Sequence, residues 1–169
     1  MLKPKDTSWG PVADWYDNLL NTDPDNYQRQ VILPNLLRLV DPKPGQQILD
    51  LACGSGFFAQ ELAKACPTIG GIVGVDVSTE LINLAKKLAT PRVTYVVSPA
   101  HQLAALKDHL FDTVISVLAI QNIAEVKEVF AAVKKVLKPG GKFIIVMNHP
   151  AFRIPGGSAW VWDEGTKKQ

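Results

Sequence analysis

The segment ILDLACGSGFFA, residues 48–59, limits the available folds more than any other part of the chain. An apolar run ends at two glycines two residues apart, and the apolar spacing of a helix follows them. This order predicts a strand, a tight turn and a helix, with glycines that let a ligand approach the backbone. Gly54, Gly56 and Ala59 also fit the G-x-G-x-x-G/A spacing of a dinucleotide fingerprint.

Strands and helices alternate along the rest of the chain. Apolar runs predict strands at 47–52, 72–77, 93–97, 111–118 and 142–147, and helical spacing predicts helices at 56–66, 79–89 and 124–137. Nearly continuous apolar strands are typical of parallel strands covered on both faces. We therefore expect an α/β fold, a doubly wound Rossmann-like parallel sheet in the order 3-2-1-4-5. Its ligand should lie beyond the carboxyl end of the first strand, at the glycine loop.

The glycine loop and the second strand favour a nucleoside as ligand. Backbone N–H groups at glycines and at a helix N-terminus attract an anion. Asp76 follows Gly56 by 20 residues and ends the second strand, where an acid takes ribose hydroxyls. The alternative is that Asp76 is an ordinary turn residue. The nucleoside would belong to a dinucleotide or to another molecule.

Asp50 discriminates between these ligands. In a dinucleotide site its charge would face the pyrophosphate, and like charges repel strongly in a partly dry site. S-adenosylmethionine removes the conflict, because it carries an adenosine, a cationic sulfonium, an ammonium and a carboxylate. The alternative is that Asp50 only caps loop amides and orders the turn, which is compatible with a ligand nearby.

Four segments in order resemble the class I S-adenosylmethionine-dependent methyltransferases of the small-molecule type. ILDLACGSG resembles the first motif of that family, GVDVS the acidic end of its second strand, FDTVISVLAIQNI its fourth strand, and VLKPGGKFIIV the passage into its fifth strand. The resemblance covers residues 46–147. It implies a methyltransferase enzyme with S-adenosylmethionine as its cofactor.

The resemblance also implies roles for individual residues. Asp50 and the loop would line the methionine half of the cofactor, Asp76 would bind the ribose, Val77 would lie against adenine, and Leu118 would lie near the sulfonium. The loop residues are Ala52, Cys53, Gly54, Ser55 and Gly56.

The sequence departs from the family pattern after the third strand. Pro99-Ala100 stands where the family usually has Asp-Ala, and proline offers no side-chain acceptor for the adenine amino group. The Ala100 amide can still donate to the ring. Ser98 and His101 are the candidates to replace the missing acceptor.

Methyl transfer requires alignment of the acceptor with an already activated carbon, and a base only if the acceptor must lose a proton. The candidates are His149, just past the fifth strand, as base, and Gln121 and Asn122 as groups that orient the acceptor. His149 would otherwise be a loop hydrogen-bonder. Cys53 and Cys66 have no metal-ligand spacing, and no metal site is expected.

Three regions are expected. Residues 1–45 would form an N-terminal segment and helices over the cofactor site, with a kink or two short helices at Pro34. Trp15, Tyr16 and Tyr27 would close over the cofactor or pack the helix onto the sheet. Residues 46–149 would form the cofactor-binding core.

Residues 150–169 would form a tail that is poorly ordered or packed through its tryptophans. Only 22 residues follow Met147, too few for the last two strands of the seven-stranded family sheet. The chain thus resembles a C-terminally short member, either a fragment or a short form. Its fifth strand would be an exposed edge that another chain could cover, giving a homo-oligomer.

Composition excludes several function classes. Net charge is +2 without a basic run, so no nucleic-acid partner is expected, and no apolar run approaches the ~20 residues of a membrane span. Two cysteines and no signal core favour the cytoplasm. Three functions are considered: a methyltransferase for an unidentified small molecule, a cofactor-binding fragment or regulatory module without a complete acceptor site, and an NAD-dependent oxidoreductase.

Overall fold

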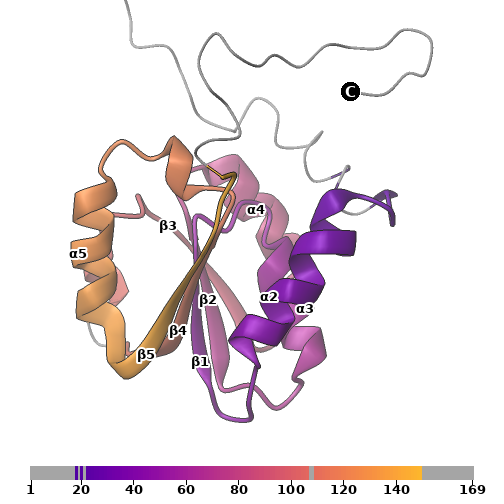
Figure 1. Cartoon of the computed structure of the whole chain (residues 1–169), viewed down its shortest axis with the longest axis horizontal. Helices are drawn as coiled ribbons and strands as arrows, with labels where there is room; N and C mark the ends of the chain where they lie inside the picture. The colour runs from indigo at the N-terminus through magenta and orange to yellow at the C-terminus, as the bar shows by residue number, and fades with distance from the viewer. Residues whose placement is uncertain (1–17, 19, 21, 107–108, 150–169) are drawn as a thin grey trace, which may run out of the picture.

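The computed structural model of the chain describes residues 18, 20, 22–106 and 109–149, drawn in colour in Figure 1. Its strands form one sheet in the order β3-β2-β1-β4-β5, and every neighbouring pair is parallel. The predicted doubly wound sheet is therefore confirmed. The strands are β1 Gln47–Leu51, β2 Gly71–Asp76, β3 Val93–Val97, β4 Phe111–Val117 and β5 Leu137–Val146. The predictions for Trp15, Tyr16, the tail 150–169 and the last two strands of the family sheet concern residues outside the described part.

Helices cover both faces of the sheet. Helices α2 (Leu33–Val40), α3 (Phe57–Ala65) and α4 (Thr79–Lys87) lie on one face, and α5 (Val126–Val136) lies on the other (Figure 1). Short 3₁₀ turns at Ala104–Leu106 and Ile120–Asn122 complete the connections. Connections between parallel strands are right-handed. Because β2 and β3 lie on one side of β1 and β4 and β5 on the other, the helices that connect them cover opposite faces of the sheet.

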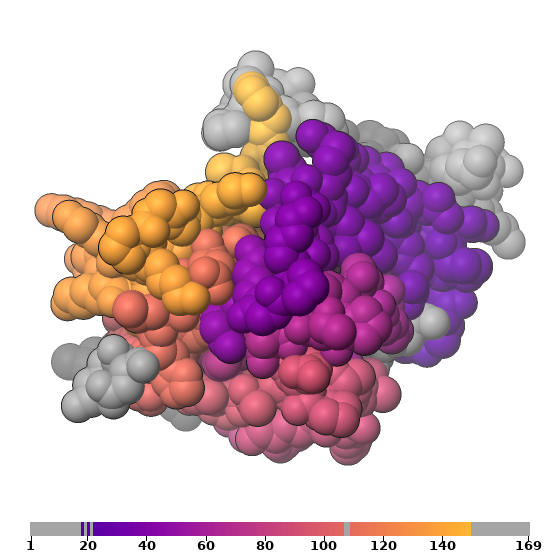
Figure 2. Space-filling model, turned by 90° about the horizontal axis from the view of Figure 1, so that it is seen from below, coloured from indigo at the N-terminus to yellow at the C-terminus, as the bar shows by residue number. Residues whose placement is uncertain are grey.

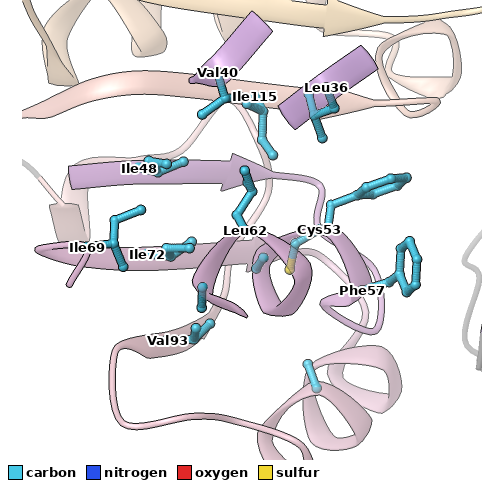
Figure 3. Packing of buried hydrophobic residues seen from close by; sticks show 14 of the residues in the cluster. Leu36, Val40, Ile48, Cys53, Phe57, Leu62, Ile69, Ile72, Val93 and Ile115 are labelled. Carbon is cyan, nitrogen blue, oxygen red and sulfur yellow. The ribbon is translucent and has the colours of Figure 1, made fainter. Parts of the chain in front are cut away.

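The sheet separates two apolar clusters. One contains Leu36 of α2, Leu62 of α3 and Ile48 of β1, which gather on the same side of the sheet in Figure 3. The other contains Leu49 of β1 and Val133 of α5. Successive residues of β1 thus face opposite clusters, as strand geometry requires. Both faces of β1 are buried, which explains its uninterrupted apolar sequence.

The sequence predicted either a kink or two short helices at Pro34, and the structure has two short helical segments there. A π-helical turn at Gln28–Ile32 is followed directly by α2, and the Leu33 N–H donates to the Gln28 carbonyl. Pro34 lies in the first turn of α2, where proline is common in helices. The wider turn therefore accommodates the proline at the junction between the two segments.

The predicted start of the fifth strand is wrong. We expected Lys142, but β5 begins at Leu137, which pairs with Phe111; the next registered pair is Thr113 with Lys142. Residues 138–141 form a bulge against β4, and Gly140 has a φ of 78°. Pro139, Gly140 and Gly141, which separate the predicted helix from the predicted strand, form an irregularity within the strand.

Figure 2 shows the molecule from the amino ends of the strands, where the segment before β1 lies across this end. A hollow of about 380 Å³ there is lined by residues that include Lys43, Asp112 and Lys138. Asp112 accepts bonds of 2.8 and 2.9 Å from Lys138 Nζ and a bond of 2.8 Å from the Gln47 N–H. Partial burial raises the pKa of Asp112, but the Gln47 N–H and the Lys138 ammonium hold it below its usual value. These paired charges secure the end of the sheet opposite the glycine loop.

Candidate functional site

The loop after β1 is folded by residues in the left-handed region of backbone conformation. Ala52, Gly54 and Gly56 have φ values of 58°, 58° and 81°. The Gly56 N–H donates to the Cys53 carbonyl over 3.0 Å, and α3 begins at the next residue. A non-glycine residue in this region is strained, which is common at ligand sites. The loop therefore leads the first turn of α3, with its N–H groups, to the carboxyl edge of the sheet.

Asp50 lies beneath this loop, near the end of β1, and is only 1% exposed. Its Oδ2 atom has no hydrogen-bond partner among the described residues. Burial, and next the charge of Asp76, raise the pKa of Asp50 from 3.8 to about 7, while the Ala59 backbone N–H opposes the rise. Buried polar atoms in native proteins nearly always have partners. A cationic group placed against Oδ2 would satisfy this atom and favour its charged form.

Asp76 ties the end of β2 to the glycine loop. Its Oδ2 accepts from the Gly54 N–H over 2.8 Å, and its Oδ1 accepts from the Ser78 N–H over 2.9 Å. Burial raises the pKa of Asp76, and these backbone N–H groups oppose the rise. The Val77 N–H opposes it as well, and the carboxylate, with about four acceptor sites, can still accept a hydroxyl group. The sequence predicted the position of this carboxylate but not its bond to the loop.

The residues beyond β2 and β3 form the next part of the edge. Val77, which follows the buried Asp76 in the chain, is 62% exposed, an unusual position for an apolar side chain. Ser98 donates its hydroxyl proton to the Gln102 carbonyl over 2.7 Å, so its lone pairs are available as acceptors.

The neighbouring residues after β3 differ in their contacts. The His101 ring lies 3.1 Å from Gln102 Nε2 and 3.9 Å from a Glu125 carboxylate oxygen. Pro99 is half-buried and its carbonyl accepts from the Gln102 N–H, while Ala100 is buried. Of the two candidates to replace the missing acid, Ser98 is therefore the one with an uncommitted acceptor.

The loops after β4 and β5 hold the remaining candidates. Leu118 has a φ of 53°, and its N–H extends the pairing of β4 with β5 by donating to Val146 over 2.7 Å. Gln121 donates its amide to the Leu118 carbonyl over 2.9 Å, which leaves its side-chain oxygen as an acceptor. Asn122 and His149 are exposed. The structure thus brings Gln121 to Leu118, and it places His149 three residues beyond β5.

Other site types are not formed by the described residues. They contain no cluster of three or more His, Cys, Asp or Glu side chains that could hold a metal ion. No helix among them is long and apolar enough to cross a membrane. Cys53 and Cys66 are buried free thiols, and burial raises the pKa of Cys53 well above its usual value. A hollow of about 200 Å³ beside α3 includes Ser55 but neither Asp50 nor Asp76 in its lining.

Sequence reasoning missed two polar residues beneath the loop. Tyr95 of β3 and Gln60 of α3 are 6% and 7% exposed, and the Gln60 amide donates to the Tyr95 hydroxyl over 2.9 Å. Tyr95 looked like one more residue of an apolar strand. The only signal was Gln60, a polar residue at a position of α3 between inward-facing neighbours.

Known proteins similar to this chain have the same architecture. The sequence model of the family described as "Methyltransferase domain" matches residues 49–145. The ubiquinone/menaquinone biosynthesis C-methyltransferase UbiE of Wigglesworthia glossinidia brevipalpis is 32% identical over 116 residues, which are 66% of this chain and 46% of that protein. The 2-phytyl-1,4-naphtoquinone methyltransferase of Trichormus variabilis is 32% identical over 144 residues, which are 82% of this chain and 61% of that protein.

A solved structure extends the comparison. The crystal structure of an S-adenosylmethionine-dependent methyltransferase from Mesorhizobium loti has 25% identity and a TM-score of 0.66, over 83% of this chain and 62% of that one. The chain spans between 39% and 61% of the length of four curated relatives. With the family match, the sheet order and the loop geometry in agreement, the chain belongs to the methyltransferase-domain family of class I S-adenosylmethionine-dependent methyltransferases.

Proposed function

We propose that this chain binds S-adenosylmethionine at the glycine loop and transfers its methyl group to a small-molecule acceptor. The observation that carries the proposal is the buried Asp50 beneath a strained loop, whose Oδ2 has no partner in the described part of the chain. A carboxylate in that position is costly unless a cation accompanies it. The ammonium of S-adenosylmethionine is such a cation, and its carboxylate suits the N-terminus of α3.

The neighbouring residues extend this assignment along the cofactor. The loop Ala52–Gly56 would line the methionine half, Asp76 would accept from the ribose hydroxyls, and the exposed Val77 would cover one face of adenine. Ala100 would donate its amide to the adenine ring, with Ser98 as the acceptor in place of the family's acid.

When bound, S-adenosylmethionine supplies an activated methyl group. The chain would align the acceptor with it, through Leu118 at the edge of the site and the polar groups of Gln121 and Asn122. The methyl group would pass to the acceptor as its bond to sulfur breaks, and the cofactor would leave as the neutral thioether product. His149 would take the acceptor proton if the acceptor must lose one.

Relatives suggest the first acceptors to test. The relatives described above carry the names of quinone methyltransferases. We infer a small acceptor with an aromatic or quinone-like ring, in a cytoplasmic setting. The edge of β5, which pairs only with β4 among the described residues, is the proposed surface for a homo-oligomer. Sedimentation analysis would test that assembly.

A second candidate is a cofactor-binding part of a larger protein, without a complete acceptor site. The observation in its favour is that the chain spans 39% to 61% of the length of four relatives. An NAD-dependent oxidoreductase is disfavoured, because the pyrophosphate would lie beside the buried Asp50.

Titration calorimetry separates these functions. We expect S-adenosylmethionine and its demethylated product to bind and NAD not to bind. Transfer of a labelled methyl group to demethylated quinones and other small phenols would then establish the activity. Binding without transfer to any acceptor would favour the second candidate, and preferential binding of NAD would contradict both.

A further inference from the structure

Asp50, Gly74 and Tyr95 form a row across three neighbouring strands. Asp50 is in register with Gly74, and Gly74 with Tyr95. A Cβ atom at Gly74 would lie 2.5 Å from Tyr95 Cδ1 and 2.9 Å from Cys53 Sγ. The tyrosine ring therefore leans across β2 toward the glycine loop, over the position where Gly74 has no side chain.

The ring also fills the space behind Gly56. A Cβ atom there would come within 2.6 Å of Tyr95 Cζ, and Gly56 has a φ of 81°. Two constraints thus act at this glycine, the left-handed backbone and the adjacent ring. The loop is in direct contact with Tyr95 at the last residue before α3.

Three hydrogen bonds close a ring of contacts beneath the loop. The Gln60 side-chain amide donates to the Tyr95 hydroxyl over 2.9 Å, and that hydroxyl donates to the Gly56 carbonyl over 3.4 Å. The Gln60 backbone N–H donates to the same carbonyl over 3.0 Å. Both side chains are more than nine-tenths buried, so water does not compete for these bonds.

We infer that Tyr95 and Gln60 are positioning residues, which hold the Gly56 peptide and with it the loop that receives the cofactor. Neither side chain touches the cofactor in this account. They act through the backbone of the loop, because the buried hydroxyl donates to the Gly56 carbonyl and the tyrosine ring fills the space behind Gly56. The inference that cofactor affinity depends on them rests on the proposed function.

The first variant is Tyr95→Phe, which removes the hydroxyl and keeps the ring. It also leaves the Gln60 amide buried without its partner, which lowers stability for a reason unrelated to the loop. The double variant Tyr95→Phe/Gln60→Met removes both polar groups and keeps a similar volume. We expect it to recover most of the lost stability, because no buried donor is left unpaired.

Two readouts follow the loop in these variants. In the ligand-free protein, the Gly56 amide should exchange with solvent about 3- to 10-fold faster in both variants, in line with the loss of one modest hydrogen bond. Calorimetry should show S-adenosylmethionine binding weakened by about the same factor in both. Thr113→Val is the matched control: it removes a buried hydroxyl bonded to Gln46 at the opposite end of the sheet, and should change neither readout.

The double variant distinguishes a positioning role of Tyr95 and Gln60 from a purely structural one. If it regains both stability and wild-type affinity, the pair is merely structural and the inference is wrong. If it regains stability while the loop amide stays exposed to exchange and affinity stays low, the positioning role is established. A wild-type protein that binds no S-adenosylmethionine would refute the proposed function instead, and amide exchange at Gly56 would still test the hold on the loop.

Discussion

Replacing Asp50 by asparagine is expected to stabilise the ligand-free protein and to weaken cofactor binding. Burial raises the pKa of Asp50 from 3.8 to about 7, so between these values the folded protein holds a proton that the unfolded chain has lost. Stability therefore falls as pH rises through this window, and above pH 7 the folded state carries the full cost of the charge. At 1.36 kcal/mol per pH unit the cost is at most roughly 4 kcal/mol.

Urea unfolding of wild type and Asp50→Asn at pH 8 and pH 5 measures this effect. The variant should be more stable by about 1–4 kcal/mol at pH 8, and the gain should shrink at pH 5, where the folded wild type is largely protonated. Calorimetry at pH 8 should show that S-adenosylmethionine binds the variant far more weakly, because the ammonium loses its charged partner. A variant that is less stable than wild type at pH 8, or that binds with unchanged affinity, would refute the reasoning.

Three further predictions concern the same site. Affinity for S-adenosylmethionine should fall by up to about tenfold for each pH unit below pH 7, because Asp50 must lose a proton to bind the ammonium. A Kd that does not change with pH would contradict this prediction. Asp76→Ala should weaken cofactor binding by roughly 1.5–3 kcal/mol, since it removes the ribose acceptor and the bond to the Gly54 N–H. Unchanged affinity in calorimetry would exclude Asp76 as the ribose acceptor. Gly74→Ala should lower the free energy of unfolding by about 1–3 kcal/mol, because the new Cβ atom would meet the Tyr95 ring. Urea unfolding measures this change, and a variant as stable as wild type would show that the ring can move aside.

The sheet order was predictable because its signals are local. Apolar runs and glycines mark each strand and turn, and the alternation with helices leaves few topologies. The start of β5 was mispredicted for the same reason: Pro139 and Gly140 are local signals of a break, whereas pairing of Leu137 with Phe111 is a contact between distant residues. A bulge joins the two without ending the strand.

The places of two candidate site residues in the fold were predictable from sequence. Asp50 lies near the carboxyl end of β1 and Asp76 ends β2, as the strand pattern indicated, and their roles as cofactor ligands stay predictions. The proposed role of Tyr95 could not be found in this way, because its ring reaches the loop only since Gly74, one strand away, has no side chain. That Asp50 Oδ2 has no hydrogen-bond partner among the residues that the structure describes was likewise not accessible from sequence, since such partners depend on the packed loop around it.

The most direct measurement is a crystal structure of the chain with the demethylated product S-adenosylhomocysteine. We predict its ammonium at a hydrogen-bond distance of about 3 Å from Asp50 and its ribose hydroxyls at a similar distance from Asp76. Its carboxylate should face the first turn of α3. A product bound elsewhere, or one that leaves the Asp50 Oδ2 atom still without a partner, would contradict the central claim that this buried carboxylate selects a cationic nucleoside.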